Sequence, residues 1–323
     1  MEHKELILGL DLGGTKIATA LATAQGEILA RGYSPTPAQD GPDVAVDSIF
    51  TTIEKTISAR KLKASQLLGI GIAAAGLVDG DKGEVISSPN LPRWREVPLR
   101  GIIEQRFEVP TYLGNDATLA ALGEWHFGLR RGIANLIYVT VGTGIGGGII
   151  ADGKLYTGAY GVAGEVGHMT VDVNGPRCNC GNIGCWEALA SGTALAKEAV
   201  SRITQGANTS IMGLVDGDMS KVDAKVIFSA VKQGDELAKE LISRLGYYLG
   251  VGLVNLVNIF NPELVLIGGG VAKMGDLLLQ PAIDIVNERA YSMAAHTVEI
   301  KPALLGDDSS LLGAVAFVLE HSG

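Results

Sequence analysis

The stretch from Gly164 to Glu187 (GEVGHMTVDVNGPRCNCGNIGCWE) constrains the fold of this chain more than any other part of its sequence. It contains all three cysteines of the 323-residue chain within eight residues, and a histidine lies ten residues before the first cysteine. One imidazole and three thiolates suit a closed tetrahedral Zn2+ site. The predicted ligands are His168, Cys178, Cys180 and Cys185. Because four protein ligands leave no open coordination position, we predict a structural zinc.

Two carboxylates, Glu165 and Glu187, lie at the ends of this stretch. Gly181 and Gly184 allow the tight backbone turns that would bring the ligands onto one ion. A metal that holds both ends of the loop would also bring the two carboxylates together. The zinc is therefore expected to build one wall of a polar binding site and to take no part in the chemistry.

Two other interpretations of the cysteines are less favoured. A disulfide with a spare thiol would need an oxidising compartment, but the N-terminus has no secretory signal, so we expect a cytoplasmic protein whose clustered thiols bind metal. A nucleic-acid-binding zinc finger would need basic surroundings, but the net charge is −9 and no Lys/Arg cluster surrounds the cysteines.

The composition indicates a large folded protein with no membrane span. A chain of 323 residues exceeds the size at which one core keeps growing, so two domains are expected. Apolar residues make up 47% of the chain, and charged residues make up only 19%, which makes extended disorder improbable. The longest apolar segment, Leu245 to Phe260, is interrupted by glycines and asparagines, so we expect no membrane-spanning helix.

The N-terminal region predicts a β-hairpin closed by the turn DLGGTK at residues 11–16. Apolar runs at 5–10 and 17–22 flank this turn, and a third strand is expected near 27–33. Backbone N–H groups in such a turn can bind phosphate oxygens, and a nearby carboxylate can orient Mg2+ through water. The predicted nucleotide-side residues here are Asp11, Gly13, Gly14, Thr15 and Lys16. By itself this pattern also fits a plain hairpin turn.

The same layout recurs later in the chain. An apolar strand at 135–141 leads into GTGIGGG, and a further strand ends at the turn 152–153. The repetition indicates an internal duplication in which each half presents a phosphate-binding turn. A third glycine turn, at 268–270, lies between an expected strand and an expected helix, which is a common place for a nucleotide. These turns add Gly142, Thr143, Gly144, Gly268 and Gly269 to the nucleotide side.

Two polar positions in the first half have open interpretations. Residues 87–92 are expected to form a loop because Pro89 and Pro92 oppose regular structure, and Asn90 in it could contact a hydroxyl group or serve as a turn residue. Asp116 follows a short strand and precedes a helix expected from Ala117. Its position alone favours an N-cap role. The alternative is a general base that the helix N-terminus keeps ionised.

Six motifs in order make the chain resemble the ROK family of repressors, open-reading-frame proteins and sugar kinases, and within it the bacterial glucokinases. They are DLGGTK at 11–16, GND at 114–116, GTGIGGG at 142–148, GEVGH at 164–168, CNCGNIGCWE at 178–187 and LIGGGV at 266–271. The resemblance implies the actin-like ATPase (RNase H-like) α/β fold, with two lobes of mixed sheets flanked by helices and a cleft between the lobes. We expect one lobe to comprise 1–116 plus about 305–323, and the other about 117–304 with the zinc loop.

The resemblance also implies ATP-dependent phosphorylation of a hexose 6-hydroxyl, with Mg2+ bound to the nucleotide and Asp116 as the catalytic base. The matching sugar contacts are Asn90, Asn115, Asp116, Glu165, His168 and Glu187. The glycine turns match the nucleotide side, and the zinc ligands carry over unchanged. Family members form dimers or tetramers, so a homo-oligomer is expected, with no nucleic-acid or membrane partner.

The sugar is less firmly indicated than the reaction. The short spacing from His168 to Cys178, the sequence CWE at 185–187 and LPRWREVPL at 91–99 favour glucose. The alternatives are an N-acetylmannosamine, N-acetylglucosamine or fructose kinase of the same family, and a non-catalytic sugar sensor. A DNA-binding repressor of the family would carry a helix-turn-helix region before the first glycine turn, whereas that turn begins here at residue 11.

Overall fold

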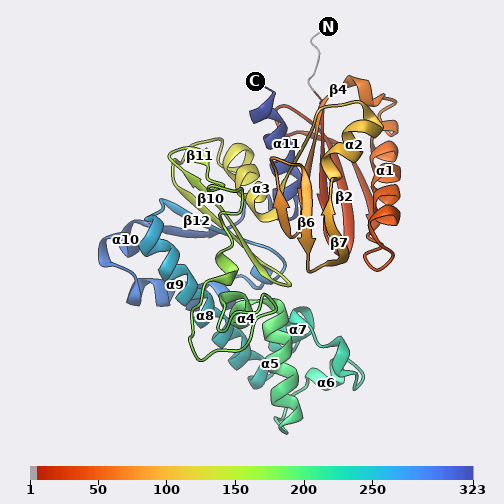
Figure 1. Cartoon of the computed structure of the whole chain (residues 1–323). Coiled ribbons are helices and arrows are strands. Elements are labelled where there is room, and N and C mark those ends of the chain that lie inside the picture. Colours follow the sequence, from red (N-terminus) through yellow and green to blue (C-terminus); the bar gives the residue numbers. More distant parts are fainter. Residues whose placement is uncertain (1–5, 323) are drawn as a thin grey trace. The chain divides into compact units, whose positions relative to one another are not determined.

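The computed structural model describes residues 6–322 (Figure 1). Residues 1–5, which include Glu5 of the first expected strand, lie outside this range. Two compact units divide the chain, one formed by Met1–Tyr138, Gly148–Gly164 and Ala303–Gly323, the other by Val139–Gly147 and Glu165–Pro302. We refer to them as unit 1 and unit 2.

Unit 1 contains a five-stranded sheet with the order β3-β2-β1-β4-β8. Its strands are β1 (Leu6–Leu12), β2 (Lys16–Thr23), β3 (Ile28–Pro35), β4 (Leu67–Ala74) and β8 (Thr111–Asn115). The helices of the unit include α1 (Pro42–Ser58), α2 (Leu99–Phe107), α3 (Asp116–Gly123) and α11 (Ser309–His321). The first hairpin, β1 and β2, is antiparallel, as the sequence predicted, whereas β4 pairs with both β1 and β8 in parallel.

The sheet of unit 1 is covered on both faces, because successive side chains of a strand point to opposite sides. In β1, Leu8 and Leu10 belong to a core shared with α1 and α2, whereas Ile7 packs with Val315 and Val318 of α11. β1 therefore lacks a solvent-facing side, which explains why its sequence is a continuous apolar run instead of an alternating one.

A second, three-stranded sheet in unit 1 corrects the prediction of a loop at 87–92. Its order is β5-β6-β7, formed by Leu77–Asp79, Glu84–Ser88 and Leu91–Val97. Pro92 lies inside β7, which is tolerated because β7 is an edge strand with one unpaired side. Asn90 lies in the two-residue turn between β6 and β7, where Ser88 pairs with Leu91.

The other five-stranded sheet has the order β11-β10-β9-β12-β13. Its strands are β9 (Leu136–Val141), β10 (Ile145–Ala151), β11 (Lys154–Leu155), β12 (Leu264–Gly268) and β13 (Glu299–Pro302), and the division between the units falls within β9 and β10. This order repeats that of the first sheet, with a three-strand meander followed by two later strands. The predicted duplication is therefore confirmed at the level of strand order.

Helices make up most of unit 2. They are α4 (Trp186–Ala190), α5 (Gly192–Thr204), α6 (Ile211–Leu214), α7 (Ala224–Lys232), α8 (Glu236–Phe260), α9 (Asp276–Arg289) and α10 (Ser292–Thr297). The long helix α8 begins after the N-cap Asp235, whose Oδ1 accepts a hydrogen bond from Ala238 N at 2.8 Å. Glycines at 246 and 250 allow the backbone of α9 to approach α8 closely. Among residues 6–322, no helix is both long and apolar enough to cross a membrane.

The compact units differ in their bounds from the lobes expected from the sequence. Helix α3 belongs to unit 1 because it packs backbone to backbone against α11: a Cβ on Gly313 would meet the carbonyl of Leu119, and a Cβ on Gly123 would meet Gly313 N at 2.6 Å. The expected lobes instead placed 117–138 and 148–164 in the second half. The lobe bounds remain a prediction.

Candidate functional site

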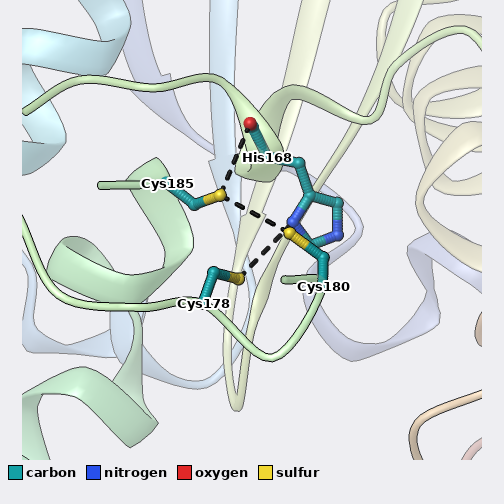
Figure 2. Close-up of side chains that lie close together, drawn as sticks. All are labelled: His168, Cys178, Cys180 and Cys185. Carbon is teal, nitrogen blue, oxygen red and sulfur yellow. Dashed lines mark hydrogen bonds between the residues drawn. The ribbon is translucent and has the colours of Figure 1, made fainter. Parts of the chain in front are cut away.

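The four predicted zinc ligands converge in unit 2. Their ligand atoms all lie within 4.8 Å of one another. Cys178 Sγ lies 3.8 Å from His168 Nδ1, and Cys180 Sγ lies 3.6 Å from Cys185 Sγ (Figure 2). Tetrahedral ligands at the usual Zn–S length are about 3.8 Å apart. The donor set and its spacing therefore both fit a structural Zn2+ ion.

Local backbone geometry produces this convergence. Gly181 and Gly184 have φ values of 96° and 67°, which are left-handed conformations that favour glycine, as the sequence predicted. Between them the chain folds back, so that Cys178 N donates to Asn182 O at 2.8 Å. Asn182 also donates through Nδ2 to Cys185 Sγ at 3.4 Å, a contact that the sequence analysis did not find. Its only sequence signal is its place between the second and third cysteines.

The thiols respond differently to their surroundings. Burial raises the pKa of the Cys185 thiol to about 12, and burial also raises the pKa of Cys178. In contrast, the backbone N–H of Asn182 lowers the pKa of Cys180. A divalent cation among these sulfurs would favour the thiolate forms over the thiols.

The loop that carries the four predicted zinc ligands, residues 168–185, is called the metal loop below. It brings the predicted carboxylates, Glu165 and Glu187, close to the imidazole of His168. While His168 Nδ1 faces Cys178, His168 Nε2 lies 3.9 Å from Glu165 Oε2. Partial burial raises the pKa of Glu165, an effect that His168 opposes and the charge of Glu187 reinforces. Glu165, His168 and Glu187 thus form one cluster of oxygen and nitrogen atoms beside the sulfurs.

The second glycine turn lies directly against this cluster. Ile145 N donates to Glu187 Oε2 at 3.0 Å, and a Cβ on Gly144 would collide with the same carboxylate. The turn is fastened to the start of α5, because Gly192 N donates to Gly142 O at 2.8 Å and Thr193 Oγ1 donates to Thr143 O at 2.7 Å. Thr193 was not among the predicted residues, since a threonine in a helix gives no local signal.

A cavity of about 780 Å³ opens beside this turn in unit 2. Gly142 and Thr143 line it together with Gly270, which follows the predicted pair Gly268-Gly269. Gly269 has a φ of 87° and passes close to the backbone of Val141. Three lysines also line the cavity: Lys197, Lys225 and Lys273. Its volume is within the usual range for small-molecule and cofactor sites.

In unit 1 the predicted residues gather at one edge of the sheet. Because β1, β4 and β8 run parallel, with Leu12 opposite Ala74 and Ala74 opposite Asn115, their carboxyl ends meet there. Ligands of open α/β sheets commonly bind outside such an edge. The first glycine turn and the start of α3 therefore lie at the same edge.

The first glycine turn carries a buried charge. Asp11 is 8% exposed at the end of β1, and burial raises the pKa of its carboxyl, whereas Lys16, with Nζ 3.9 Å from Oδ2, opposes that rise. The turn is closed by Gly13 N, which donates to Lys16 O at 3.0 Å. Gly14 lies against Asn90, since a Cβ on Gly14 would be 2.9 Å from Asn90 O. Thr15 accepts through its carbonyl from the backbone of the next loop.

The N-cap of α3 is Asn115, so the N-cap interpretation that position favoured for Asp116 is wrong. Asn115 Oδ1 accepts from Ala117 N and Thr118 N, both at 3.0 Å, and Nδ2 donates to Gly76 O at 3.0 Å. Asp116 is the first helical residue, and its Oδ1 accepts from Ala117 N at 2.8 Å. Both residues can cap a helix, and only the backbone decides which one does.

The predicted residues form two groups, each assembled within its own unit. Unit 1 holds Asp11, Gly13, Gly14, Thr15, Lys16, Asn90, Asn115 and Asp116. Unit 2 holds Gly142, Thr143, Gly144, Glu165, His168, Cys178, Cys180, Cys185, Glu187, Gly268 and Gly269. That the two groups form one site remains a prediction.

Two sheets of the same strand order, each with a glycine turn after its first strand, define a protein of the actin-like ATPase fold. Residues 7–321 match the ROK family. The chain belongs to this family, as the motifs of its sequence indicated.

Relatives with different activities are similar to this chain over nearly its whole length. The glucokinase of Halalkalibacterium halodurans is 38% identical over 308 residues, which are 95% of this chain and 92% of that protein. The xylose repressor of Caldicellulosiruptor bescii is 36% identical over 313 residues, which are 97% of this chain and 78% of that protein. The crystal structure of a ROK family glucokinase from Streptomyces griseus in complex with glucose and AMPPNP has a TM-score of 0.85 and 35% identity, and the match covers 98% of this chain and 99% of that one.

Proposed function

We propose that the protein is an ATP-dependent glucokinase, which transfers the γ-phosphoryl group of ATP to the 6-hydroxyl of glucose. Similarity to glucokinases over nearly the whole chain supports this reaction. The observation that carries the proposal is the placement of Asp116. It begins α3 at the sheet edge that also bears the first glycine turn, while Asn115 caps the helix.

Sugar recognition would rely on polar groups from both units. Glu165, His168 and Glu187 form the cluster that the metal loop supports, and Asn90 and Asn115 belong to the other group. Carboxylates accept hydrogen bonds and amides both donate and accept, so such a set can distinguish the stereocentres of a hexose. His168, Cys178, Cys180 and Cys185 would hold a zinc ion, which would support the loop between the two glutamates.

In the transfer itself, the 6-oxygen of glucose attacks the γ-phosphorus as Asp116 accepts the hydroxyl proton. The new O–P bond forms while the bond from the γ-phosphorus to the bridging oxygen breaks, and ADP leaves. Backbone N–H groups of the glycine turns hold the phosphates, and Mg2+ supplies charge neutralisation when it is bound with the nucleotide. Asp11 would orient that ion through water.

Asp116→Asn tests the assignment of the base. Turnover should fall by about 10²- to 10⁴-fold, which is the usual contribution of a general base, while glucose affinity measured by calorimetry changes little. Asp43→Asn is a matched control, because Asp43 is an exposed carboxylate in the first turn of α1. Unchanged turnover in Asp116→Asn would remove Asp116 as the base.

The sugar and the phosphoryl donor need separate measurements. Initial rates on glucose, N-acetylmannosamine, N-acetylglucosamine and fructose should favour glucose, and a wide preference for an acetylated sugar would overturn that assignment. With glucose as acceptor, ATP, ADP and polyphosphate can be compared as donors. ATP should give the highest kcat/KM.

A sugar-responsive regulator is the second candidate, because a xylose repressor matches 97% of this chain. The net charge of −9 opposes binding to DNA phosphates. Sugar binding without phosphoryl transfer to any of the four sugars would favour the regulator. Rapid ADP formation that depends on glucose would exclude a purely regulatory role.

A further inference from the structure

Glu124 is a completely buried carboxylate at the C-terminal end of α3. Its side chain accepts three hydrogen bonds from residues 304–309. Oε2 accepts from Leu304 N at 2.9 Å. Oε1 accepts from Leu305 N at 2.9 Å and from Ser309 Oγ at 2.7 Å. All three donors are neutral. A carboxylate in such surroundings is stable only while its hydrogen bonds are complete, so it holds the segment in one arrangement.

The segment that Glu124 holds, residues 304–309, leads into α11 and includes its first residue. Residues 303–308 bring the chain back into unit 1, and α11 starts at Ser309. The adjacent residue, Ser310, lowers the pKa of the Asp11 carboxyl at the first glycine turn, an effect smaller than the rise caused by burial. The start of α11 is thus tied to the buried carboxylate at the end of α3, and it lies near Asp11 on the nucleotide side.

Because the backbones of α3 and α11 are in contact, a change at the start of α11 would be transmitted to α3. The glycines Gly123 and Gly313 let α3 and α11 touch without intervening side chains. Directly after α3 in the chain, residues Glu124–Gly128 form a π-helix, a wider turn that is common at functional positions. Since α3 has eight residues, its two ends are only about 12 Å apart, and a shift at Glu124 would move the whole helix.

An apolar residue could fill the same space, and buried charges are often replaced by apolar groups without loss of stability. A leucine side chain at position 124 would make only non-directional contacts, however, so it would not fix the position of α3 along residues 304–309. Three directed hydrogen bonds admit only one register between α3 and the start of α11. The carboxylate therefore defines position more than it adds stability.

We propose that Glu124 is a positioning residue for phosphoryl transfer, because it fixes α3 against the start of α11 and so sets the place of the Asp116 carboxylate. This inference rests on the proposed function, in which Asp116 is the base. Glu124 acts through α3 and touches neither substrate.

Glu124→Gln tests the role with little change in shape. An amide has one oxygen, so either Leu304 N or Leu305 N would face an N–H group. We expect kcat to fall by about 10- to 100-fold, because a small displacement of a catalytic group has such effects, and KM for glucose to stay within about threefold. Thr56→Val is the control, since it removes the buried Thr19–Thr56 hydroxyl pair in the same unit, away from α3. An equal loss of kcat in both variants, measured well below their Tm values, would overturn the proposal.

A double-mutant cycle separates positioning from general damage. If Glu124 acts through Asp116, Glu124→Gln should lower the residual rate of Asp116→Asn by less than about twofold, because residues that act as a unit are not additive. The same fold loss in both backgrounds would overturn the positioning role and leave the base assignment intact. Unchanged turnover in Asp116→Asn alone would instead overturn the base, and this proposal with it.

Ser309→Ala is a milder second variant if Glu124→Gln does not fold. It removes one of the three hydrogen bonds and leaves the carboxylate and both backbone donors. Its kcat should fall by about two- to fivefold, in line with the loss of one hydrogen bond. A wild-type kcat in Ser309→Ala, together with a Glu124→Gln variant that cannot be folded, would overturn the proposal.

Discussion

The two glycine turns of the duplicated sheets use the same device in different chemical settings. In unit 1, Gly14 lies against Asn90, and in unit 2, Gly144 lies against the carboxylate of Glu187. In both cases a Cβ on the glycine would displace a polar residue that we predict to contact the sugar. Each turn proposed to bind phosphate is therefore in direct contact with a residue proposed to bind the acceptor.

The turns differ in charge and in attachment. The first contains the ion pair of Asp11 and Lys16, whereas the second has no charged residue and is fastened through backbone groups to the start of α5. Asn90 belongs to a short hairpin, whereas Glu187 lies in α4, two residues after the predicted zinc ligand Cys185. Both halves thus keep a glycine against a polar residue, and the supporting structure has diverged around it.

The largest expected loss of activity comes from removing a predicted zinc ligand next to the second glycine turn. Cys185→Ser removes one ligand two residues before Glu187, so kcat/KM for glucose should fall by about 100-fold or more, which exceeds typical losses from residues that only orient a ligand. Metal analysis should find about one zinc per wild-type chain and less than half of that in the variant. A wild-type chain with under half an equivalent of zinc would contradict the prediction, as would a variant that keeps its zinc.

The convergence of His168 with the three cysteines was predictable because their spacing is local, and so were the two hairpins. Pro92 misled the prediction, because a proline opposes a strand unless that strand lies at an edge, and the edge is set by pairing with β6. Asn115 and Asp116 are equally able to cap a helix, so only the backbone could assign the cap. Glu124 binds a segment about 180 residues away, and no local pattern reveals such a contact.

The second turn can be disturbed without removing the metal. In Gly144→Ala the new methyl group would displace the Glu187 carboxylate and break its bond to Ile145 N, so KM for glucose should rise by about 10- to 100-fold with zinc retained. Gly213→Ala is the control, because a Cβ there meets nothing within 4 Å. An unchanged KM for glucose in Gly144→Ala would mean that Glu187 does not contact the sugar.

The corresponding change in unit 1 should have a smaller effect. Gly14→Ala would press on Asn90, but the exposed two-residue turn that carries Asn90 can move more easily than a loop that we propose to be held by zinc. KM for glucose should therefore rise by about tenfold or less. Gly101→Ala, in α2 with open space around its Cβ, is the control. If Gly14→Ala were more damaging than Gly144→Ala, the metal loop would not be the more rigid support.

The buried charge of the first turn should give the smallest effect, and it is an effect on stability. The pKa of Asp11 is raised from 3.8 by burial, so its contribution to folding stability is fully present below pH 3.8 and is lost as the pH rises through the higher folded-state pKa. Asn at this position cannot ionise and avoids that loss. Asp11→Asn should therefore have a Tm a few degrees above wild type at pH 8, with a smaller gap at pH 4.5, while kcat falls because Asp11 orients Mg2+ in the proposed mechanism.

Thermal unfolding between pH 4.5 and 8 measures this gap directly. Gly101→Ala adds no titratable group and should give a Tm difference from wild type that does not change with pH. If the gap between Asp11→Asn and wild type shrank as the pH rose, Lys16 and Ser310 would outweigh burial, and the ionised carboxylate would stabilise the fold. A gap that widens with pH would instead mean that this turn keeps a costly charge, as expected if Asp11 has the proposed role at the nucleotide.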